Sequence, residues 1–495
     1  VQKTLIGASI GPEEATTEKR MSTTLPALHL CTMNPPFTRS VYGNLLFGAV
    51  RGPGRQELQR RLQNVRDESK LKANITAGLG SVFVAIADRL MRKNGVLALV
   101  LPKSVLSGKA WTPTREIFQQ YHVKYVICSH EPKNWNFSES TKLSEVLLVL
   151  AKGANKSAVT TFINLWKQPK SSVEALSIVH EVERRTPGDL TASAGTCEIR
   201  TGGKKYGEMN QLSLLKHSRV SWALPVSFAQ TDLCRVAYHL SQGKLFQPGV
   251  GQIGAIELVK LSGVSGVTTL GPDGRDVYDG FSLTSSPTPY PAFWGYDAEE
   301  LRRFAQSSNL YLSPLTKPRP RRPLRDANLL WSRSGTLMLP KELRLTTSRV
   351  VGVVLPHPAL SNVWWPTRWR SEDAKQREAM ERRLALWFNS TLGLFTLLMQ
   401  RQETEGPWAK FPKAWYEQLH ILDLKSLTKS QTNALDSIWE KAQSEELLPF
   451  PQLCSDPTRK LIDDAIAKAI GISSDVLDQL RSLLSREPVI SMQAL

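Results

Sequence analysis

The chain has 495 residues, a net charge of +18, and 41% hydrophobic and 22% charged residues. This composition is typical of a folded protein of two or three domains, and no run approaches the roughly 20 apolar residues that a membrane helix needs. Five scattered cysteines, never spaced Cys-x-x-Cys, argue against a structural zinc and favour a reducing compartment, while the basic excess favours a polyanionic partner over a merely basic background.

Residues 1–24 are polar and irregular, and we interpret them as a connector. From 25 to 152, strand-like apolar runs alternate with helical patterns, which predicts a mainly parallel sheet with helices on both faces. The predicted strands are 28–33, 97–101, 123–128 and 146–150, and the predicted helices are 81–91 and 113–121. The last two strands flank a polar loop, so we expect an antiparallel hairpin that closes the edge of the sheet.

The first predicted strand ends in Asn34-Pro35-Pro36-Phe37. The prolines fix φ and carry no N–H, so the Pro35 carbonyl and the Asn34 side-chain oxygen can be held as acceptors for one exocyclic amino group. When these two oxygens accept hydrogen bonds from both hydrogens of the amino group, the amine nitrogen becomes more nucleophilic. Phe37 can stack on the flat base that carries the amino group. In open α/β sheets, ligands bind at the carboxyl ends of strands, where Asn34 falls. The structural alternative is a proline-stiffened loop with a buried Phe.

The next segment, 153–244, is predicted to be a linking α/β region with helices at 173–184 and within 224–240. Gly249–Gly254 has the Gly-x-Gly-x-x-Gly spacing, but it follows the polar residues 241–244 with no strand ahead, so we interpret it as a loop. Short β-prone runs such as 350–355, rich in surrounding Gly, Pro, Ser and Thr, predict a mostly β module within 245–425.

The C-terminal part is predicted to be helical. A long helical pattern covers 372–400 with one apolar face, and 426–495 forms a helical tail that includes 458–470 and 474–486. Ser455 or Asp456 can cap the first of these tail helices, and Pro457 is placed near its opening position.

Several stretches together resemble one enzyme family. Asn-Pro-Pro-Tyr/Phe at a strand end is similar to the catalytic motif of amino-group DNA methyltransferases, chiefly those that methylate adenine N6. Gly78–Leu90 resembles the helix after the motif, Asn94–Pro102 resembles the next core strand, and Asn136–Val149 resembles the segment whose aromatic residue packs on the extruded base. Trp387–Gly393 resembles the target-recognition part of restriction–modification enzymes. The resemblance is strong over about 25–150 and looser to about 480.

This resemblance implies a Rossmann-like α/β methyltransferase sheet, incomplete at its N-terminus, followed by a mixed α+β target-recognition region over 245–425 and the helical tail. It implies site-specific transfer of a methyl group from S-adenosylmethionine to adenine N6 of a flipped base, a reaction of class EC 2.1.1. The family carries its cofactor pocket on a Gly-rich strand–loop–helix before the motif. Here the only candidate is Gly7–Gly11, so we expect the cofactor-binding residues upstream of Val1 and little activity from this chain alone. His29 stands where the family often has an acid.

The resemblance also assigns roles to residues. Asn34, Pro35, Pro36 and Phe37 are the predicted catalytic residues, and Phe137 is the candidate for the second face of the base, with core packing as the alternative. Lys103 and Ser104 are candidates for lining the pocket or contacting a phosphate, with plain surface as the alternative. The predicted DNA-binding residues, which lie in the segment where the family reads DNA, are Arg319, Arg321, Arg322, Arg368 and Arg370. The proline-stiffened stretch Pro318–Pro323 suits either a spacer or a phosphate-contacting strand.

Double-stranded DNA is the expected partner, with a restriction or specificity subunit as a further one, in a prokaryotic cytoplasm and without a metal or a membrane. The alternative from another class is a non-catalytic DNA-specificity protein that kept a degenerate methyltransferase shell. Cytosine-N4 methylation, or methylation of an RNA or protein amino group, is less favoured. Cytosine-C5 chemistry is disfavoured because Phe37, and no cysteine, follows the prolines.

Overall fold

The computed structural model describes residues 26–37, 47, 50, 52–138, 144–153, 158–214, 217, 220–403 and 406–495. The chain forms two compact units. One comprises Val1–Leu101, Gly108–Lys124 and Leu148–Lys156, and the other comprises Pro102–Ser107, Tyr125–Leu147 and Ser157–Leu495. The predicted connector 1–24 and the Gly7–Gly11 candidate lie outside the described residues, and the predicted domain boundaries stay predictions.

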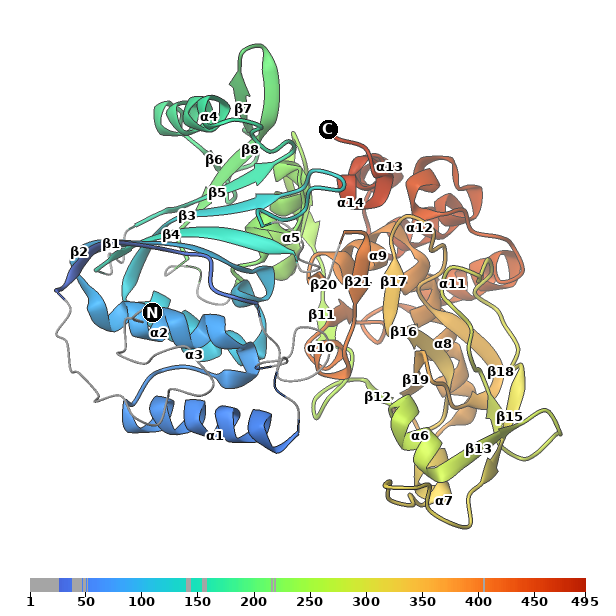
Figure 1. Ribbon diagram of the computed structural model, residues 1–495. Helices are drawn as coiled ribbons and strands as arrows, with labels where there is room; N and C mark the ends of the chain where they lie inside the picture. Colours follow the sequence, from blue (N-terminus) through green and yellow to red (C-terminus); the bar gives the residue numbers. More distant parts are fainter. Residues whose placement is uncertain are drawn as a thin grey trace. The chain divides into compact units, whose positions relative to one another are not determined.

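In the first unit, two helices connect a pair of parallel strands and a third helix follows. β1 (Leu28–Met33) pairs with β2 (Met91–Pro102), and α2 (Leu79–Leu90) packs against α3 (Thr112–Phe118), as Figure 1 shows in blue. The strand predicted at 97–101 is thus longer than expected. From Gly95 onward every second residue of β2 is buried, as the period of a strand requires. An additional helix, α1 (Pro53–Glu68), was not predicted.

The largest sheet is mixed. Its order is β1-β2-β4-β3-β5-β8-β6, with β7 paired to β8. β1 with β2, β3 with β5 and β6 with β8 are parallel, whereas β8 runs antiparallel to β5 and β7. The further strands are β3 (Tyr121–Ser129), β4 (Glu145–Lys152), β5 (Thr160–Leu165), β6 (Gly188–Asp189), β7 (Cys197–Thr201) and β8 (Lys204–Leu212).

This strand order corrects one expectation. β3 and β4 are neighbours, but they do not close the edge of the sheet, because β4 lies beside β2 and β3 lies beside β5. The reason is that later strands extend the sheet beyond β3, since β5 pairs with β3 and β8 pairs with β5. The mixed α/β class itself is confirmed.

Residues 244–422 form a set of small antiparallel sheets, in agreement with the predicted β-rich module. They are β9 (Lys244–Gln247) with β10 (Gly251–Ala255); β11 (Leu258–Lys260) with β22 (His420–Leu422); β12 (Thr268–Leu270), β19 (Trp364–Trp369), β16 (Gly335–Pro340) and β18 (Val353–Ala359); β13 (Phe281–Thr284), β15 (Leu310–Pro314) and β14 (Pro291–Ala292); and β17 (Glu342–Arg344), β21 (Trp408–Lys410) and β20 (Gln402–Glu403).

The Gly249–Gly254 stretch is a hairpin, so the loop interpretation was wrong. β9 lies ahead of it, and Gly249 (φ 82°) and Gly251 (φ 115°) provide the left-handed turn into β10. Because a strand and no helix follows the glycines, the stretch lacks the strand–turn–helix context of a dinucleotide-binding loop.

The helices of the second unit are α4 (Ser172–Arg184), α5 (Thr231–Ser241), α6 (Gly274–Gly280), α7 (Ala327–Trp331), α8 (Ala374–Asn389), α9 (Thr391–Leu398), α10 (Lys413–Tyr416), α11 (Lys429–Ala442), α12 (Pro457–Ile470), α13 (Ser474–Arg486) and α14 (Pro488–Ser491). The longer predicted helices are present, one of them with a break, whereas the short helices α6, α7 and α10 were not predicted. The predicted 372–400 helix divides at Ser390, which caps α9 through the Gly393 N–H at 3.1 Å. Asp456, and not Ser455, caps α12 through the Arg459 N–H at 2.9 Å. None of the described helices has the length and apolar character of a bilayer-spanning segment.

Candidate functional site

The Asn-Pro-Pro-Phe motif directly follows β1. Met33, the last residue of β1, pairs with Leu99 of the parallel strand β2, so Asn34 leaves the carboxyl end of the strand as predicted. Asn34 is exposed, Pro35 is buried and Phe37 is half-buried. A motif with its first side chain exposed and its first proline anchored can present the Asn34 oxygen to a ligand while the backbone is held still.

Gly80 explains how Pro35 is anchored. A Cβ at Gly80, in the first turn of α2, would lie 3.2 Å from the Trp111 ring, 3.5 Å from a Leu101 methyl group and 3.7 Å from Pro35 Cγ. A bare backbone here lets the helix approach the proline and its neighbours closely. The sequence predicted the helix but not the close approach at Gly80. A glycine inside an apolar helical pattern was the feature that could have indicated it.

Lys103 and Ser104 begin the short 3-10 helix Lys103–Leu106 that follows β2, the parallel neighbour of β1. Lys103 is only 8% exposed, and its N–H donates to the carbonyl of Ser144 at 2.7 Å. Lys103 is therefore not a plain surface lysine, while Ser104 is half-buried. Whether these residues line a base pocket or contact a phosphate stays a prediction.

Phe137 lies in a loop that a buried carboxylate holds. The N–H groups of Phe137 and Ser138 donate to Glu145 Oε2 at 2.7 and 2.8 Å, and Glu145 is 1% exposed at the start of β4. The half-buried Phe137 ring packs on an apolar cluster that includes Ile163. The contacts of Phe137 are thus those of the packing alternative, and its stacking on a base stays a prediction. The sequence analysis did not identify Glu145. An acidic residue directly before an apolar strand was the feature that could have indicated it.

Within the second unit, the same loop contacts a hairpin of the predicted recognition region. A Cβ at Gly406, whose φ is 54°, would lie 2.9 Å from Trp135 Nε1. Gly406 lies in the connection between β20 and β21, and β20 also contacts the 3-10 helix that contains Lys103. The β20–β21 hairpin therefore lies against both segments that carry predicted base-contacting residues.

The three arginines of the proline-rich stretch differ in their contacts. Arg319 donates to the carbonyl of Tyr278 at 2.9 Å and lies over its ring, and Arg322 forms a bidentate ion pair with Asp279. The Arg322 guanidinium lowers the pKa of the Asp279 carboxyl. Arg321, with φ 60°, is exposed, and its side chain forms no hydrogen bond or ion pair with a described residue. Two of these arginines thus fix the stretch to the region around α6, and Arg321 alone is left to contact a ligand.

Arg368 and Arg370 lie at the end of β19 and immediately beyond it. Both are exposed, while Trp369 between them is 1% exposed, so the strand alternation directs both arginines away from the core. Arg370 donates to the carbonyl of Val264 at 2.9 Å and also to that of Gly263. The Arg368 side chain forms neither a hydrogen bond nor an ion pair with a described residue.

The string Trp387–Gly393 is buried and cannot contact DNA directly. Asn389 accepts from the Val351 N–H at 2.8 Å and donates to the carbonyl of Gly352 at 2.7 Å. Thr391 donates through its backbone N–H, at 2.7 Å, and its hydroxyl, at 2.5 Å, to the two oxygens of Asp463. The string therefore builds the α8–α9 junction.

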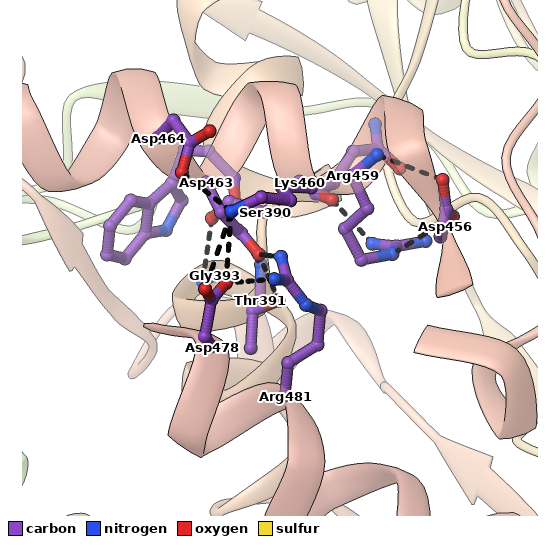
Figure 2. A network of polar contacts seen from close by, with 12 residues as sticks. Ser390, Thr391, Gly393, Asp456, Arg459, Lys460, Asp463, Asp464, Asp478 and Arg481 are labelled. Atoms are coloured by element: carbon purple, nitrogen blue, oxygen red, sulfur yellow. Dashed lines mark hydrogen bonds and ion pairs between the residues drawn. The ribbon is translucent and has the colours of Figure 1, made fainter. Parts of the chain in front are cut away.

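Figure 2 shows the polar network around this junction. Arg481 of α13 donates to Asp463 Oδ2 at 2.7 Å and also pairs with Asp478, and buried Arg459 of α12 donates to the carbonyl of Asn389 at 2.5 Å. Because a buried charge is tolerated only with such partners, the network fixes α12 and α13 to the junction. Its role is structural. Among the described residues, no group of three or more His, Cys, Asp or Glu side chains could hold a metal ion.

No protein-family model and no curated protein match the chain. Among solved structures, it is similar to the type IIL restriction-modification enzyme MmeI in complex with DNA (TM-score 0.39, 10% identity, 92% of this chain and 57% of that one). It is also similar to the type IIG restriction endonuclease BpuSI (TM-score 0.33, 13% identity, 94% and 55%) and to the methyltransferase subunit of a type I restriction-modification system from Streptococcus thermophilus (0.26, 16%, 41% and 38%). The chain spans little more than half the length of the first two proteins.

Proposed function

We propose that this chain is part of a site-specific DNA methyltransferase that transfers a methyl group from S-adenosylmethionine to adenine N6. The single observation that carries the proposal is the placement of the Asn-Pro-Pro-Phe motif. It leaves the carboxyl end of a parallel strand, with Asn34 exposed and Pro35 buried beside Gly80. Ligands of open α/β sheets bind at this edge.

In the proposed reaction, Asn34 Oδ1 and the Pro35 carbonyl each accept a hydrogen bond from the adenine amino group. The base must first leave the duplex, at a cost of a few kcal/mol, because a stacked amine is unreachable. When bound, S-adenosylmethionine supplies an electrophilic methyl carbon. The amine nitrogen forms a bond to that carbon as the carbon–sulfur bond breaks, and the amine then loses a proton to solvent. Positioning and alignment contribute most of the rate enhancement, and Phe37 stacks on the base.

The described residues before Asn34 are 26–33, and none of them forms a Gly-rich turn between a strand and a helix. We therefore assign no residue to the cofactor and derive no step from its contacts.

Duplex DNA is the proposed partner. The net charge of +18 and the exposed Arg321 and Arg368 support it, because phosphate neutralisation contributes much of DNA affinity. The intramolecular contacts of Arg319, Arg322 and Arg370 give them a second role as supports of the loops that would face DNA. A restriction or specificity subunit and a prokaryotic cytoplasmic location belong to the same proposal.

The test is a methyl-transfer assay with the native protein, radiolabelled S-adenosylmethionine and a mixture of duplex sequences. We expect labelled DNA whose digestion releases N6-methyladenine, and we expect Asn34→Ala to lower transfer by a factor of 100 or more while DNA affinity stays within about twofold. Release of N4-methylcytosine would redirect the proposal to cytosine.

Full methylation by the Asn34→Ala variant would overturn the catalytic assignment. Titration of S-adenosylmethionine into the native protein separates the enzyme from the alternative. A protein that binds duplex DNA but neither binds this cofactor nor transfers a methyl group would be a DNA-specificity protein with a methyltransferase-like shell.

A further inference from the structure

Two cations in the second unit share one pair of acceptors. Lys413 Nζ lies 3.3 Å from the carbonyl oxygen of Leu270 and 3.2 Å from that of Gly271. Arg333 Nη2 lies 3.1 and 3.5 Å from the same two oxygens. Because both donors contact the same carbonyls, the two positive charges are held close together at the end of β12.

The two charges are not neutralised by the protein. Carbonyl oxygens are dipoles without net charge, and within the described part of the chain neither Arg333 nor Lys413 forms an ion pair. Burial and the nearby Arg333 lower the pKa of Lys413, while Glu417, Asp276 and Asp273 act on it in the opposite sense from beyond ion-pair distance. An anion placed between the cations would remove their mutual repulsion.

The chemistry of the pair suits a phosphate. Lys413 has three N–H donors and Arg333 has five, so donors remain on both side chains after the two carbonyls are satisfied. A guanidinium with a neighbouring ammonium can bind two oxygens of one phosphate through charge-assisted hydrogen bonds. Arg333 is exposed and Lys413 is half-buried, so the pair is accessible and partly prearranged.

Neighbouring cations continue from this pair along the strands. β12 runs antiparallel to β19, where Thr269 pairs with Arg368, and the Arg370 N–H donates to the carbonyl of Val267 at 2.9 Å. From Val267 to Gly271 an extended strand covers about 13 Å, at about 3.3 Å per residue. Over that axial length one DNA strand presents about four phosphates, at about 3.4 Å each.

We propose that Arg333 and Lys413 form a phosphate clamp for the DNA backbone, with Arg368 on a neighbouring phosphate of the same strand. This inference rests on the proposed function, since it assumes that duplex DNA is the partner. A row of cations beside an edge strand suits a linear polyanion better than a free phosphate ion. The clamp positions the recognition region on DNA and reads no base.

The test measures binding of the full-length protein to a fluorescein-labelled 30-base-pair duplex by anisotropy at several NaCl concentrations. The variants are Arg333→Gln, Lys413→Gln and the double variant. The matched control is Lys375→Gln, which removes one exposed charge in the first turn of α8. Each lost phosphate contact should lower the magnitude of the salt slope by about one. We expect weaker binding and a shallower slope for each clamp variant, and wild-type behaviour for the control.

Two further measurements keep the outcome interpretable. Thermal unfolding and circular dichroism report whether the variants remain folded, and Arg333→Lys, which keeps the charge, should restore most of the slope. Inorganic phosphate, at ionic strength matched with NaCl, should compete for the clamp and displace DNA more readily from the wild type than from the double variant. Phosphate that binds the wild type but not the double variant, while both bind DNA equally, would indicate a free-anion site and overturn the clamp.

If the folded clamp variants bind DNA with the wild-type slope, the clamp is wrong while DNA binding stands. If the wild type itself fails to bind duplex DNA at low salt, the proposed function fails, and the clamp fails with it. The two failures are therefore distinguishable by the wild-type titration alone.

Discussion

At the scale of single residues, Gly80 brings the backbone of α2 close to Pro35. Its missing side chain leaves the space in which Trp111, Leu101 and Pro35 meet α2. A side chain at position 80 has to displace either the Trp111 ring or Pro35. A motif that works by positioning is sensitive to such displacement, since an error of about 1 Å can lower a rate about 100-fold.

We therefore expect a graded effect from Gly80→Ala and Gly80→Val. The alanine Cβ, 3.2 Å from the Trp111 ring, requires only a small adjustment, whereas the branched valine should displace Pro35 and lower methyl transfer tenfold or more. Overpacking should also destabilise the valine variant by about 1–3 kcal/mol. Transfer rates and thermal unfolding of the pair provide the measurement. A valine variant with the rate of the wild type would show that Gly80 does not position the motif.

The position of the Asn-Pro-Pro-Phe motif at a strand end was predictable at the residue scale, whereas the residues that support the motif and the Phe137 loop were not. Asn34 and Pro35 are adjacent in sequence, so their chemistry can be read locally. Glu145 receives N–H bonds from residues seven and eight positions earlier, and Gly80 meets Trp111 31 positions later. Contacts of this kind depend on how the chain folds back on itself, which local periodicity does not report.

At the scale of elements, period-2 and period-3.6 patterns predicted the strands β1 to β4 and helices such as α4, α12 and α13. Most of the short strands from β5 to β22 were not predicted individually, and two predicted arrangements differ from the structure. The second half of the 372–400 pattern is mostly apolar, and its apolar periodicity continues across the polar run Asn389–Thr391, where the helix breaks. The break is made by the Ser390 cap and by Asn389, which bonds to the backbone around Val351. Likewise, the order of β3 and β4 in the sheet depends on strands later in the chain.

Gly393 provides a direct test of the α8–α9 junction. A Cβ at this position would lie 1.8 Å from the carbonyl oxygen of Trp387, a backbone atom that the cap of α9 holds in place. Gly393→Ala should therefore open the junction and destabilise the fold by about 3 kcal/mol or more. The matched control is Gly254→Ala, whose Cβ would meet only the Leu245 side chain at 3.7 Å. Unfolding midpoints of the two variants provide the comparison, and equal midpoints would contradict the junction geometry.

At the scale of the whole molecule, the cationic side chains fall into two groups: those bound to internal partners and those exposed to solvent. Many arginines of this basic chain are committed to internal partners, as Arg459 and Arg481 are in the network of Figure 2. Net charge alone therefore overstates the DNA-binding surface, and exposed cations such as Arg333 and Arg368 are the ones available to phosphates. Several carboxyl groups are buried as well, which makes the stability of the fold depend on pH.

Glu208 of β8 gives this dependence a defined direction. Burial raises the pKa of its carboxyl from the ordinary 4.5 to about 7, against the opposing effect of the hydrogen bond from the Thr231 N–H at 2.7 Å. Between about pH 4.5 and 7 the folded state thus binds more protons than the unfolded state, so this group lowers the free energy of unfolding as the pH rises. Below pH 4.5 both states are protonated, and above pH 7 both are ionised and the full cost of the buried charge is present.

Glu208→Gln should remove this cost while keeping an oxygen acceptor for the Thr231 N–H. We expect the variant to be more stable than the wild type at pH 8, by on the order of 1–3 kcal/mol, and nearly equal to it at pH 4. Glu183→Gln, at an exposed position of α4, should leave the difference between the two pH values unchanged. The free energies of unfolding of the three proteins, measured at pH 4 and at pH 8, test this prediction. If Glu208→Gln lost stability at pH 8, the ionised carboxylate would be a net stabilising partner of α5, and the pKa of Glu208 would have to lie below 4.5.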